Sequence, residues 1–363
     1  MKRITLCVTN DLSGDQRLHR ICTTLHEAGN SVCLIGRRLP DSQALRSRPY
    51  QLRRLSLPFH HGKLFYLSYN LRLAWELIMR PGHIIVSNDL DTLLGCFLAS
   101  KIRNRPLVYD SHEYFTEVPE LIGRQWSRRV WLKLEQLLLP RLRHAYTVNG
   151  SLARIYRERY GIDMKVVRNL PFPRKPDLSL RSRNVIIYQG SVNLGRGLEL
   201  AIEAMAFLPG YQLWIVGKGD VLEELQQKVK QLRLEKQVTF WGFKPPEELW
   251  ALTPQATLGL SIEEDLGGNY HYASPNKVFD YIQAQVPVLV SDLPEMRATV
   301  EEYKVGQILL EQERKPRELA SRMRSMLEDQ VYYQAWVAAC TKAAKILNWE
   351  AEKQTLLSIF RSI

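Results

Sequence analysis

Residues 185–197 read Val185-Ile-Ile-Tyr-Gln-Gly-Ser-Val-Asn-Leu-Gly-Arg-Gly197, and this stretch decides the fold. It opens with β-branched and aromatic residues, which favour a buried strand, and its glycines favour a tight turn. A helical pattern follows directly. The stretch is therefore one strand-to-helix unit of the kind that builds parallel sheets.

The same strand-to-helix pattern repeats along almost the whole chain. The strands expected in the first half are residues 4–9, 32–35, 83–87, 107–109, 145–148 and 165–167. Those expected in the second half are residues 185–188, 212–216, 238–241, 257–261, 286–290 and 307–310. The sequence therefore predicts an α/β protein with two tandem, Rossmann-like, doubly wound domains.

A change in composition marks the domain boundary. Proline and arginine dominate Pro171-Phe-Pro-Arg-Lys-Pro176, and a polar tail follows, which predicts a linker over residues 171–183. The first domain then covers residues 1–170 and the second covers residues 184–346. A last helix, within residues 347–363, lies far in sequence from the strands of its own domain and can pack elsewhere.

The composition excludes several classes of protein. The 363 residues are 45% apolar and 24% charged, which is typical of packed domains and not of disorder. The five cysteines are scattered without metal-ligand spacing, which indicates a reducing compartment. No stretch is apolar enough to span a bilayer, and the apolar start ends at Asn10 without a cleavage site. We therefore expect a cytoplasmic protein.

The net charge of +12 is divided unevenly along the chain. Residues 1–170 carry +13, whereas residues 171–363 carry −1. A basic half indicates an anionic partner for that half. Nucleic acid is one alternative, but its recognition motifs and stacking aromatics are missing. We therefore expect an anionic membrane surface and no nucleic acid.

In doubly wound sheets, ligands bind at the carboxyl ends of the strands, so the residues after each strand are the candidate site. Gly190, Ser191 and Arg196 follow the first strand of the second domain. Backbone N–H groups and a guanidinium at this position suit the oxygens of a diphosphate. The alternative is that the glycines only allow a tight turn.

The next two strands of the second domain also end in glycine turns. Gly217 follows one of them, and Gly242 with Phe243 follows the other. An aromatic ring at the rim of a sheet suits a flat base, whose edge main-chain groups can read. The alternative is that Phe243 fills space between strand and helix.

The most specific signal is Ser274-Pro-Asn-Lys-Val-Phe-Asp-Tyr281. Ser274 suits an N-cap and the following proline suits the first helical position, which predicts a helix to about residue 285. Asn276 and Lys277 then lie in the first turn, where a cation is unfavourable unless an anion is bound. Asp280 lies one turn along the same face, where a carboxylate suits ribose hydroxyls. The alternative is a solvent-exposed pair of Lys277 and Asp280.

These motifs, in this order and spacing, resemble the donor half of GT-B glycosyltransferases of the family-four type. That family contains retaining, metal-independent enzymes that use sugar nucleotides. The resemblance covers essentially the whole chain, because Asn348-Trp-Glu350 is similar to the start of the family's terminal helix, which crosses back to the first domain. The motifs are Tyr188-Gln-Gly190 with Arg196-Gly197, Ile215-Val-Gly-Lys-Gly219, Phe240-Trp-Gly-Phe243, Ser274–Tyr281 and Val286-Pro-Val-Leu289.

The chain departs from this family in one motif, a pair of acids. The family's two glutamates, eight residues apart, would fall at Tyr272 and Asp280, so the first acid is missing and the second is shortened. Branches with a Pro-Asn-Lys loop are more similar, and there Lys277 takes over part of the donor contact. The nearby substitutes for the lost carboxylate are Glu263, Glu264 and Asp265.

Titratable residues crowd the end of one strand in the first domain, in Asp110-Ser-His-Glu113. His112 could hydrogen-bond a sugar hydroxyl or help move the acceptor proton, with Asp110 or Glu113 holding its tautomer. The resemblance implies the same, since the family carries a histidine at this strand end. The alternative is a structural histidine.

The loop after the first strand holds the acceptor-side candidates. In the family this loop lines the cleft near the donor sugar and the acceptor, and only Gly14 of its usual glycines remains here. Asp15 and Arg17 are the candidates beside it. A helix-capping acid and a solvated arginine explain these two residues equally well.

Asp89-Leu-Asp91 contains the Asp-x-Asp metal signature of the other large transferase fold. Capping of the following helix explains both acids more simply. We therefore expect no metal site and no cofactor, and a nucleoside-diphosphate sugar as substrate.

A basic amphipathic helix is predicted within residues 124–143. Its apolar stripe consists of Trp126, Val130, Leu134 and Leu138, and basic residues surround this stripe. A basic helix that carries tryptophan is typical of binding to a membrane surface. The alternative is an ordinary core helix with a basic outer face.

Together these features predict a glycosyltransferase that moves a sugar from a nucleoside diphosphate to a glycan or lipid-linked acceptor. The expected setting is the synthesis of a cell-surface polysaccharide or lipopolysaccharide, at the inner face of the membrane. Arg196 and Lys277 would neutralise the leaving diphosphate, and retention is implied by the resemblance. The alternatives are a sugar-nucleotide epimerase on the same fold and a non-catalytic, sugar-nucleotide-binding relative.

Overall fold

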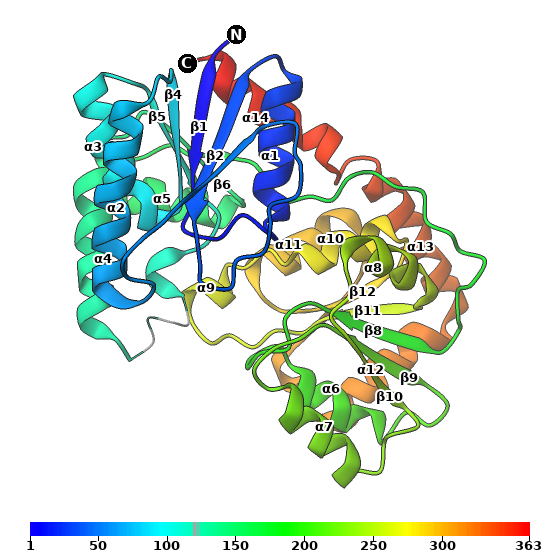
Figure 1. Ribbon diagram of the computed structural model, residues 1–363. Helices are drawn as coiled ribbons and strands as arrows, with labels where there is room; N and C mark the ends of the chain where they lie inside the picture. The colour runs from blue at the N-terminus through cyan, green and yellow to red at the C-terminus, as the bar shows by residue number, and fades with distance from the viewer. Residues whose placement is uncertain (119–120, 122) are drawn as a thin grey trace. The chain divides into compact units, whose positions relative to one another are not determined.

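The computed structural model describes residues 1–118, 121 and 123–363. The chain forms two compact units, of which the first contains Met1–Asn169 and Glu352–Ile363 and the second contains Leu170–Ala351 (Figure 1). Each unit is a parallel sheet with helices on both of its faces. The predicted α/β class with two doubly wound units is therefore confirmed.

The first unit contains a seven-stranded sheet in the order β3-β2-β1-β4-β5-β6-β7. The order along the chain reverses between β1 and β4, which makes this the topological switch point where ligands bind. The elements are β1 (Arg3–Cys7), α1 (Gln16–Glu27), β2 (Ser31–Arg37), β3 (Gln51–Leu55), α2 (Gly62–Met79), β4 (Ile84–Asn88), α3 (Leu90–Arg103), β5 (Leu107–Ser111), α4 (Gln125–Leu138), β6 (His144–Thr147), α5 (Gly150–Tyr160), β7 (Lys165–Val166) and most of α14 (Trp349–Arg361).

Helices α2, α3 and α4 lie together on one face of this sheet, and α1 and α14 lie on the other (Figure 1). Although α14 is the last helix of the chain, its side chains are tied to the first unit. Glu352 accepts hydrogen bonds from the backbone N–H of Arg168 at 2.8 Å and from its guanidinium at 3.0 Å. The ammonium of Lys2 donates to the carbonyl of Phe360 at 3.0 Å.

The edge strand β3 is an element that the sequence patterns do not predict. Its apolar alternation is interrupted by Arg53 and Arg54. The side chains of both arginines contact residues outside the sheet. Arg53 forms an ion pair with Glu76 at 3.0 Å, and Arg54 donates to the carbonyl of Asp11 at 2.6 Å. Charged residues are common on edge strands because they discourage pairing with other chains.

The second unit contains a six-stranded sheet in the order β10-β9-β8-β11-β12-β13, with its switch point between β8 and β11. Its elements are β8 (Val185–Gln189), α6 (Leu198–Met205), β9 (Gln212–Val216), α7 (Leu222–Gln231), β10 (Val238–Gly242), α8 (Pro246–Leu252), β11 (Leu258–Ser261), α9 (Gly268–His271), α10 (Asn276–Gln283), β12 (Val288–Ser291), α11 (Pro294–Tyr303), β13 (Gly306–Leu309), α12 (Pro316–Glu328) and α13 (Gln330–Ala344).

Successive residues of this second sheet point to opposite helix layers. Ile186 and Tyr188 pack with α6, α7 and α12, whereas Val185 and Ile187 pack with α8, α10, α11 and α13. Because both faces are covered, the strands are nearly continuous apolar runs. All six strands expected in this half are present, each within two residues of its predicted ends.

Residues 171–183 contain no helix or strand, and hydrogen bonds hold part of this segment against the second unit. The guanidinium of Arg181 donates to the carbonyls of Pro254 at 3.1 Å and Ala284 at 2.8 Å. The backbone N–H of Ser182 donates to the carbonyl of Gln255 at 2.8 Å. Among the described residues, no helix is both long and apolar enough to cross a membrane.

Candidate functional site

Lys277 is the centre of a buried ionic cluster at the switch point of the second sheet. Its side chain is only 8% exposed, and its ammonium lies 2.7 Å from a carboxylate oxygen of Glu263, which follows β11. The same ammonium lies 4.0 Å from the centre of the Tyr188 ring, a cation–π distance. The alternative of a solvent-exposed pair with Asp280 is therefore wrong.

The carboxylate of Glu263 lies near two cations. Its second oxygen accepts a hydrogen bond from Ser261 at 2.8 Å, and the guanidinium of Arg196 lies 3.9 Å from the first. Burial alone would raise the pKa of Glu263, but the ammonium of Lys277 and the hydrogen bonds from Lys277 and Ser261 lower it below its ordinary value. Two cations around one ionised acid leave a net positive charge, which suits a phosphate group.

Glycines allow the loops around this cluster to lie close together. A Cβ atom on Gly190 would lie 3.4 Å from Cε of Lys277, and its φ of +138° is rarely adopted by other residues. A Cβ atom on Gly217 would approach the carbonyl oxygen of Gly190 to 1.8 Å, so only glycine fits there. The ends of β8 and β9 are thereby held beside Lys277.

Asp280 is linked to the end of β8 through a glutamine. The side-chain amide of Gln189 donates to Asp280 at 3.2 Å and accepts from the Thr253 hydroxyl at 2.7 Å. The carboxylate of Asp280, one turn along α10 from Lys277, is half-buried. The two residues predicted to bind diphosphate and ribose thus lie on one helix beside one strand end.

Helix α10 begins later than predicted. Pro275 keeps an extended conformation, with ψ of 128°, and stands at the N-cap position, so Ser274 is not the cap. The helix ends at Gln283 because Gln285 adopts a positive φ of 57°. Asn276 and Ser191, the other predicted diphosphate ligands, are both exposed.

The predicted base-binding turns also lie next to each other. The backbone N–H of Gly217 donates to the carbonyl of Gly242 at 2.9 Å. Phe243 is 64% exposed, so the alternative that it fills the core is wrong. The ammonium of Lys218 lies 5.4 Å from the centre of the Phe243 ring.

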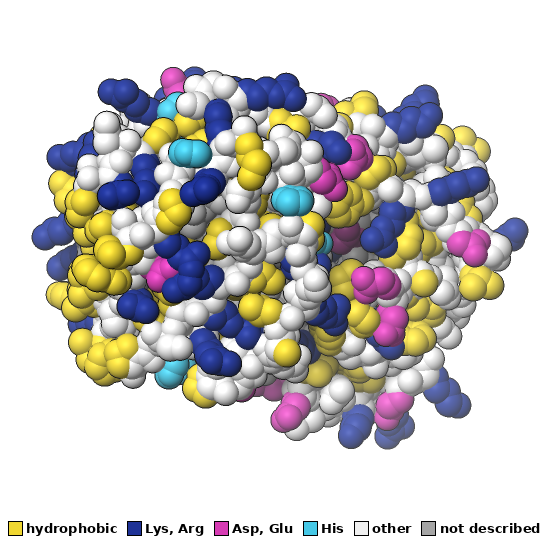
Figure 2. Space-filling model, turned by 45° about the horizontal axis from the view of Figure 1, so that its top comes forward, with side chains coloured by type: hydrophobic (Ala, Val, Ile, Leu, Met, Phe, Trp, Pro, Cys, Tyr) yellow, Lys and Arg dark blue, Asp and Glu magenta, His cyan; other side chains and the backbone are white. Residues whose placement is uncertain are grey.

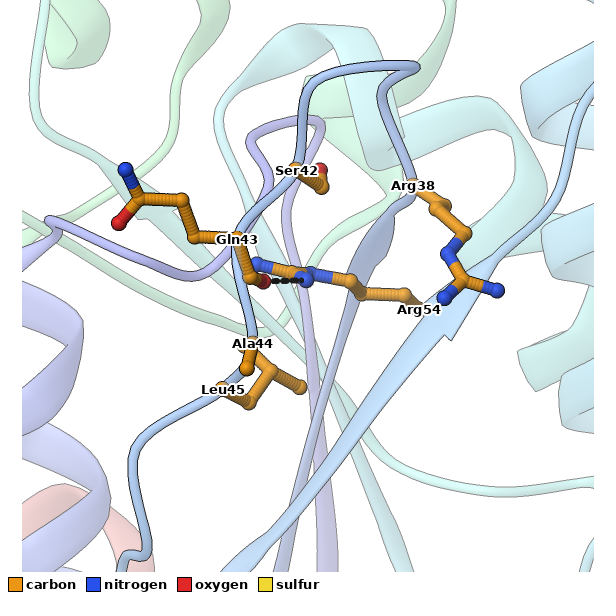
Figure 3. Close-up of a pocket in the computed structure, with 6 residues that line it drawn as sticks. All are labelled: Arg38, Ser42, Gln43, Ala44, Leu45 and Arg54. Carbon is orange, nitrogen blue, oxygen red and sulfur yellow. Dashed lines mark hydrogen bonds between the residues drawn. The ribbon is translucent and has the colours of Figure 1, made fainter.

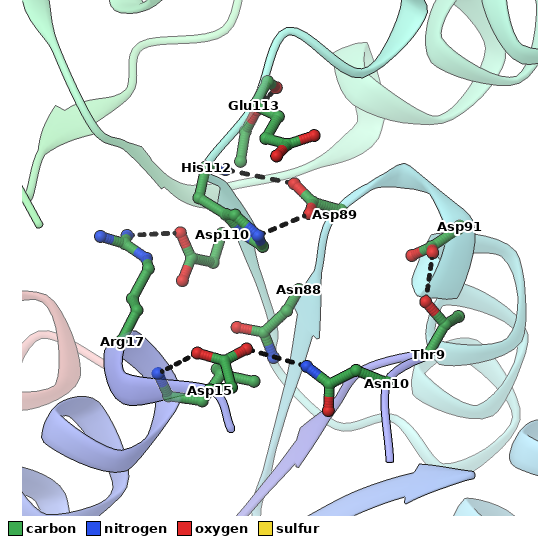
Figure 4. Close-up of polar contacts among 12 residues, drawn as sticks. Thr9, Asn10, Asp15, Arg17, Asn88, Asp89, Asp91, Asp110, His112 and Glu113 are labelled. Carbon is green, nitrogen blue, oxygen red and sulfur yellow. Dashed lines mark hydrogen bonds and ion pairs between the residues drawn. The ribbon is translucent and has the colours of Figure 1, made fainter. Parts of the chain in front are cut away.

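In the first unit, His112 follows β5 and its partner is Asp89, which follows β4 (Figure 4). The ring Nε2 lies 3.0 Å from one oxygen of Asp89, and the backbone N–H of His112 donates to the other at 3.2 Å. Burial would lower the pKa of His112, but the attraction of Asp89, with a smaller contribution from Asp110, raises it to about 10. The predicted partners, Asp110 and Glu113, are therefore not the residues that hold the imidazole.

Asp110 instead forms a buried ion pair with Arg17. The guanidinium of Arg17 lies 2.8 Å from Asp110 (Figure 4). It also donates to the carbonyl of Val167 at 3.2 Å. Arg17 is 5% exposed and Asp110 is fully buried, so the alternative of a solvated arginine is wrong. Glu113 is exposed.

Asp89 occupies the N-cap position of α3, but its side chain makes no capping hydrogen bond. Its backbone has φ of 58° and ψ of 172°, a conformation that costs about 1–3 kcal/mol for a residue with a side chain. The backbone N–H of Asp89 donates to the carbonyl of Asp110 at 2.8 Å, which helps to hold this conformation. In this strained backbone conformation, the carboxylate of Asp89 points toward His112.

Asp91, the second acid of Asp-x-Asp, has a partner other than His112. Asp91 accepts a hydrogen bond from Thr9 at 2.5 Å, and burial raises its pKa to about 7. Among the described residues, no group of three or more His, Cys, Asp or Glu side chains is arranged to hold a metal ion. The two carboxylates are therefore used for contacts within the protein.

The remaining acceptor-side candidates lie at the start of α1. Asp15 caps this helix, because its carboxylate accepts from the N–H of Leu18 at 2.9 Å, and it also binds Asn10 at 2.9 Å (Figure 4). The capping explanation of Asp15 is therefore confirmed. Gly14 is exposed, and a Cβ atom there would meet no other atom within 4 Å.

An open hollow of about 430 Å³ lies in the first unit, beside the loop between β2 and β3. Its lining consists of Arg38, Ser42, Gln43, Ala44, Leu45 and Arg54 (Figure 3). The guanidinium of Arg54 is held by the carbonyls of Gln43 and Asp11, at 2.5 and 2.6 Å. None of the residues predicted for the site lines this hollow.

Asp89 and Tyr188 are site residues whose roles the sequence motifs do not reveal. Asp89 is brought to His112 by the pairing of β4 with β5. Tyr188 lies within an apolar strand and looks like a core residue. The position of Asp89 directly after a strand at the switch point is the one signal that could have found it.

No curated protein sequence matches the chain. Among solved structures, sucrose-phosphate synthase from Thermosynechococcus elongatus is similar with a TM-score of 0.78 at 17% identity, covering 100% of this chain and 99% of that one. HepE of Anabaena, in complex with UDP and glucose, has a TM-score of 0.74 at 18% identity over 100% of both chains. WaaG, a glycosyltransferase involved in lipopolysaccharide biosynthesis, has a TM-score of 0.72 at 16% identity, covering 97% and 99%. At these identities the likeness shows the fold.

Two family descriptions match consecutive parts of the sequence. The first, "Glycosyl transferase 4-like domain", matches residues 14–173, and the second, "Glycosyl transferases group 1", matches residues 174–343. The border between them lies close to Asn169, where the first unit gives way to the second. Since the two matches span both doubly wound units, the chain belongs to the GT-B glycosyltransferases of group 1.

Proposed function

We propose that this glycosyltransferase transfers a sugar, with retention of configuration, from a nucleoside diphosphate to a lipid-linked or glycan acceptor. The observation that carries the proposal is the cluster of Lys277, Arg196 and Glu263 at the switch point of the second sheet. Its two cations share a single buried acid, which leaves a net positive charge that suits a phosphate group. HepE, which has the same fold, is solved with UDP and with UDP-glucose, which supports a uridine nucleotide as the first donor to try.

The diphosphate, the ribose and the base of the donor would be bound by residues of the second unit. Lys277 and Arg196 neutralise the charge that develops on the diphosphate as the glycosidic bond breaks, with Gly190, Ser191 and Asn276 beside them. Asp280 accepts from the ribose hydroxyls. The exposed ring of Phe243, next to Gly242 and Gly217, stacks on the base.

His112 of the first unit would act on the sugar as a hydrogen-bond donor. With a pKa of about 10 it is protonated at neutral pH, so it is not free to accept the proton of the acceptor hydroxyl. Its buried Nδ1 atom has no hydrogen-bond partner within the part of the chain that the structure describes. We therefore assign Nδ1–H to a sugar hydroxyl and assign Asp89 to the positioning of the ring.

The acceptor is proposed to be a lipid-linked intermediate or growing glycan of a surface polysaccharide or lipopolysaccharide, reached at the cytoplasmic face of a membrane. The excess of positive charge in residues 1–170 supports this setting, since anionic lipid attracts basic surfaces. Gly14 and the half-buried Asp15 lie in the β1–α1 loop, which we assign to the acceptor side, whereas Arg17, the third candidate, is held in its buried ion pair with Asp110.

The donor is tested by thermal unfolding of the protein with a panel of sugar nucleotides. The correct donor at a hundred times its Kd is expected to stabilise the protein by about 2.7 kcal/mol. The stabilising nucleotide sugar is then incubated with the enzyme without any acceptor. Unchanged sugar supports a transferase, whereas conversion to an epimer would identify a sugar-nucleotide epimerase. Binding without transfer to any of a panel of lipid-linked acceptors would favour a non-catalytic relative.

Removal of divalent metal ions is expected to leave transfer unchanged. The carboxylates of Asp89 and Asp91 face His112 and Thr9, and Lys277 with Arg196 can take the place of a cation at the diphosphate. The measurement is the initial rate of transfer before and after treatment with EDTA. A rate that vanishes, and returns with manganese or magnesium, would contradict the expectation.

A further inference from the structure

Helix α2 exposes a second apolar face that the fold does not cover. Its inner face buries Phe65, Tyr69, Leu73 and Leu77 against the first unit. The opposite stripe consists of Leu64, Leu67, Leu71, Trp75 and Met79, which are between 55% and 64% exposed. A helix with apolar residues on two opposite faces is expected in a core or in contact with lipid, and this one lies at the surface.

The apolar surface continues from α2 onto the two neighbouring helices. Leu98 and Ile102 of α3 are 41% and 64% exposed, and Trp126 and Val130 of α4 are 60% and 44% exposed. Tyr66 of α2 packs edge-on against Trp131 of α4 with ring centres 5.0 Å apart, so the helices are in contact. We call the outer surface of α2, α3 and α4 the α2–α4 face. Figure 2 shows apolar and basic side chains together on the side where Figure 1 places these helices.

The sequence pattern located only part of this face. Of the predicted stripe on α4, Trp126 and Val130 are exposed, but Leu134 is half-buried and Leu138 is buried. The apolar stripe of α2 is longer, and it is hidden in the sequence because the buried face of the same helix is equally apolar.

Charge on the α2–α4 face is of one sign. All residues of the three helices are described, and all of their acids, Glu76, Asp91 and Glu135, are buried. Their exposed basic residues are Lys63, Arg72, Lys101, Arg103, Arg129 and Lys133. By helical periodicity, Lys63 and Arg72 lie along the two edges of the α2 stripe, where long side chains can reach lipid headgroups while the stripe enters the bilayer.

We propose that the α2–α4 face docks on an anionic lipid bilayer, with the α2 stripe inserted among the acyl chains. The inference rests on the proposed function, because an enzyme docked on the membrane would reach an acceptor that is held in that membrane. A second copy of this chain fits the face poorly, because two surfaces that expose only basic charges repel each other. A lipid surface with negative headgroups satisfies both the apolar stripe and the cations around it.

The test is flotation of the full-length protein with phosphatidylcholine vesicles that contain or lack phosphatidylglycerol. The protein is expected to float with the anionic vesicles and to remain behind with the neutral ones. The variant Leu67→Ser/Leu71→Ser/Trp75→Ser is expected to bind at least about tenfold more weakly, since three inserted side chains are lost. The variant Arg129→Gln/Lys133→Gln is also expected to bind about tenfold more weakly and to be less sensitive to salt.

A matched control is Val331→Ser/Tyr332→Ser, which changes two apolar residues on α13 of the second unit that are at least as exposed as those of the α2 stripe changed here. It is expected to float like the unmodified protein. Equal flotation of the α2 variant and this control would overturn the proposal. So would a protein that is dimeric in solution and becomes monomeric only in the α2 variant, because the face would then join two copies. Thermal stabilisation by the donor is measured on every variant and tests the nucleotide site separately, because it needs no membrane.

Discussion

Replacing Lys277 with alanine is expected to lower kcat/KM for sugar transfer by at least about 10²-fold to 10³-fold, the usual cost of removing one group that stabilises developing charge. Lys277 contributes a buried cation beside Gly190, at the strand ends where we place the diphosphate. Because the leaving group gains negative charge as the bond breaks, the loss is expected in kcat as well as in donor affinity. The measurement is steady-state transfer with the donor identified by thermal unfolding.

The same substitution also leaves Glu263 without its main partner. Removing one member of a buried pair costs about 3–5 kcal/mol, so low activity of Lys277→Ala could reflect unfolding. The double variant Lys277→Met/Glu263→Gln removes both charges and is expected to fold. Lys230→Ala on α7, which removes an exposed cation of the same unit, is the matched control and is expected to keep full activity. Transfer near the unmodified rate by a folded double variant would contradict the role given to Lys277.

Replacing His112 with glutamine is expected to lower kcat by about 10²-fold or more, since a charged donor to the reacting sugar is lost. The pH dependence distinguishes a donor from a base. As a donor, His112 is active in its protonated form, so its contribution persists through neutral pH and is lost as the pH rises through about 10. A general base would show the opposite dependence, with activity rising through the pKa of the histidine.

Asp89→Asn keeps the size of the side chain but removes the charge that holds the pKa of His112 high. The alkaline limit of activity is therefore expected to move toward neutral pH in this variant. Asp89→Gly should relieve the backbone strain at φ of 58° while also releasing the imidazole, so it is expected to be no less stable than Asp89→Asn yet equally impaired. Asp91→Asn is the matched control, because Asp91 lies near Asp89, with a pKa that burial raises to about 7, but its carboxylate binds Thr9. An alkaline limit that is unchanged in Asp89→Asn would show that His112 does not act as proposed.

Protein stability should follow the same titration. The pKa of His112 is raised in the folded state above its ordinary value of 6.5, so its contribution is fully present below pH 6.5 and is lost as the pH rises toward 10. The free energy of unfolding of the unmodified protein is therefore expected to fall over this interval more steeply than that of Asp89→Asn. Urea unfolding at a series of pH values measures the difference.

The buried strands could be predicted because the second sheet is covered on both faces and its strands are nearly continuous apolar runs. The edge strand β3 could not, since Arg53 and Arg54 break its pattern and are held by Glu76 and Asp11 from distant parts of the chain. Helix α10 was located, but its first residue was not, because Pro275 keeps an extended conformation where the sequence pattern places the first helical residue.

The sequence by itself determined the fold class, the positions of the candidate residues after the strands, and the half of the chain that carries the excess positive charge. Those features follow from local patterns of apolar residues, glycines and charges. Only the tertiary structure decided the partners, Glu263 for Lys277, Asp89 for His112 and Arg17 for Asp110. Glu263 and Asp89 each follow a strand, whereas Arg17 lies in the first turn of α1, and the fold brings together residues that are up to 93 positions apart, as Arg17 and Asp110 are. Which apolar face of α2 is exposed was likewise decided by packing, because the sequence of a helix with two apolar faces does not say which of them the sheet will cover.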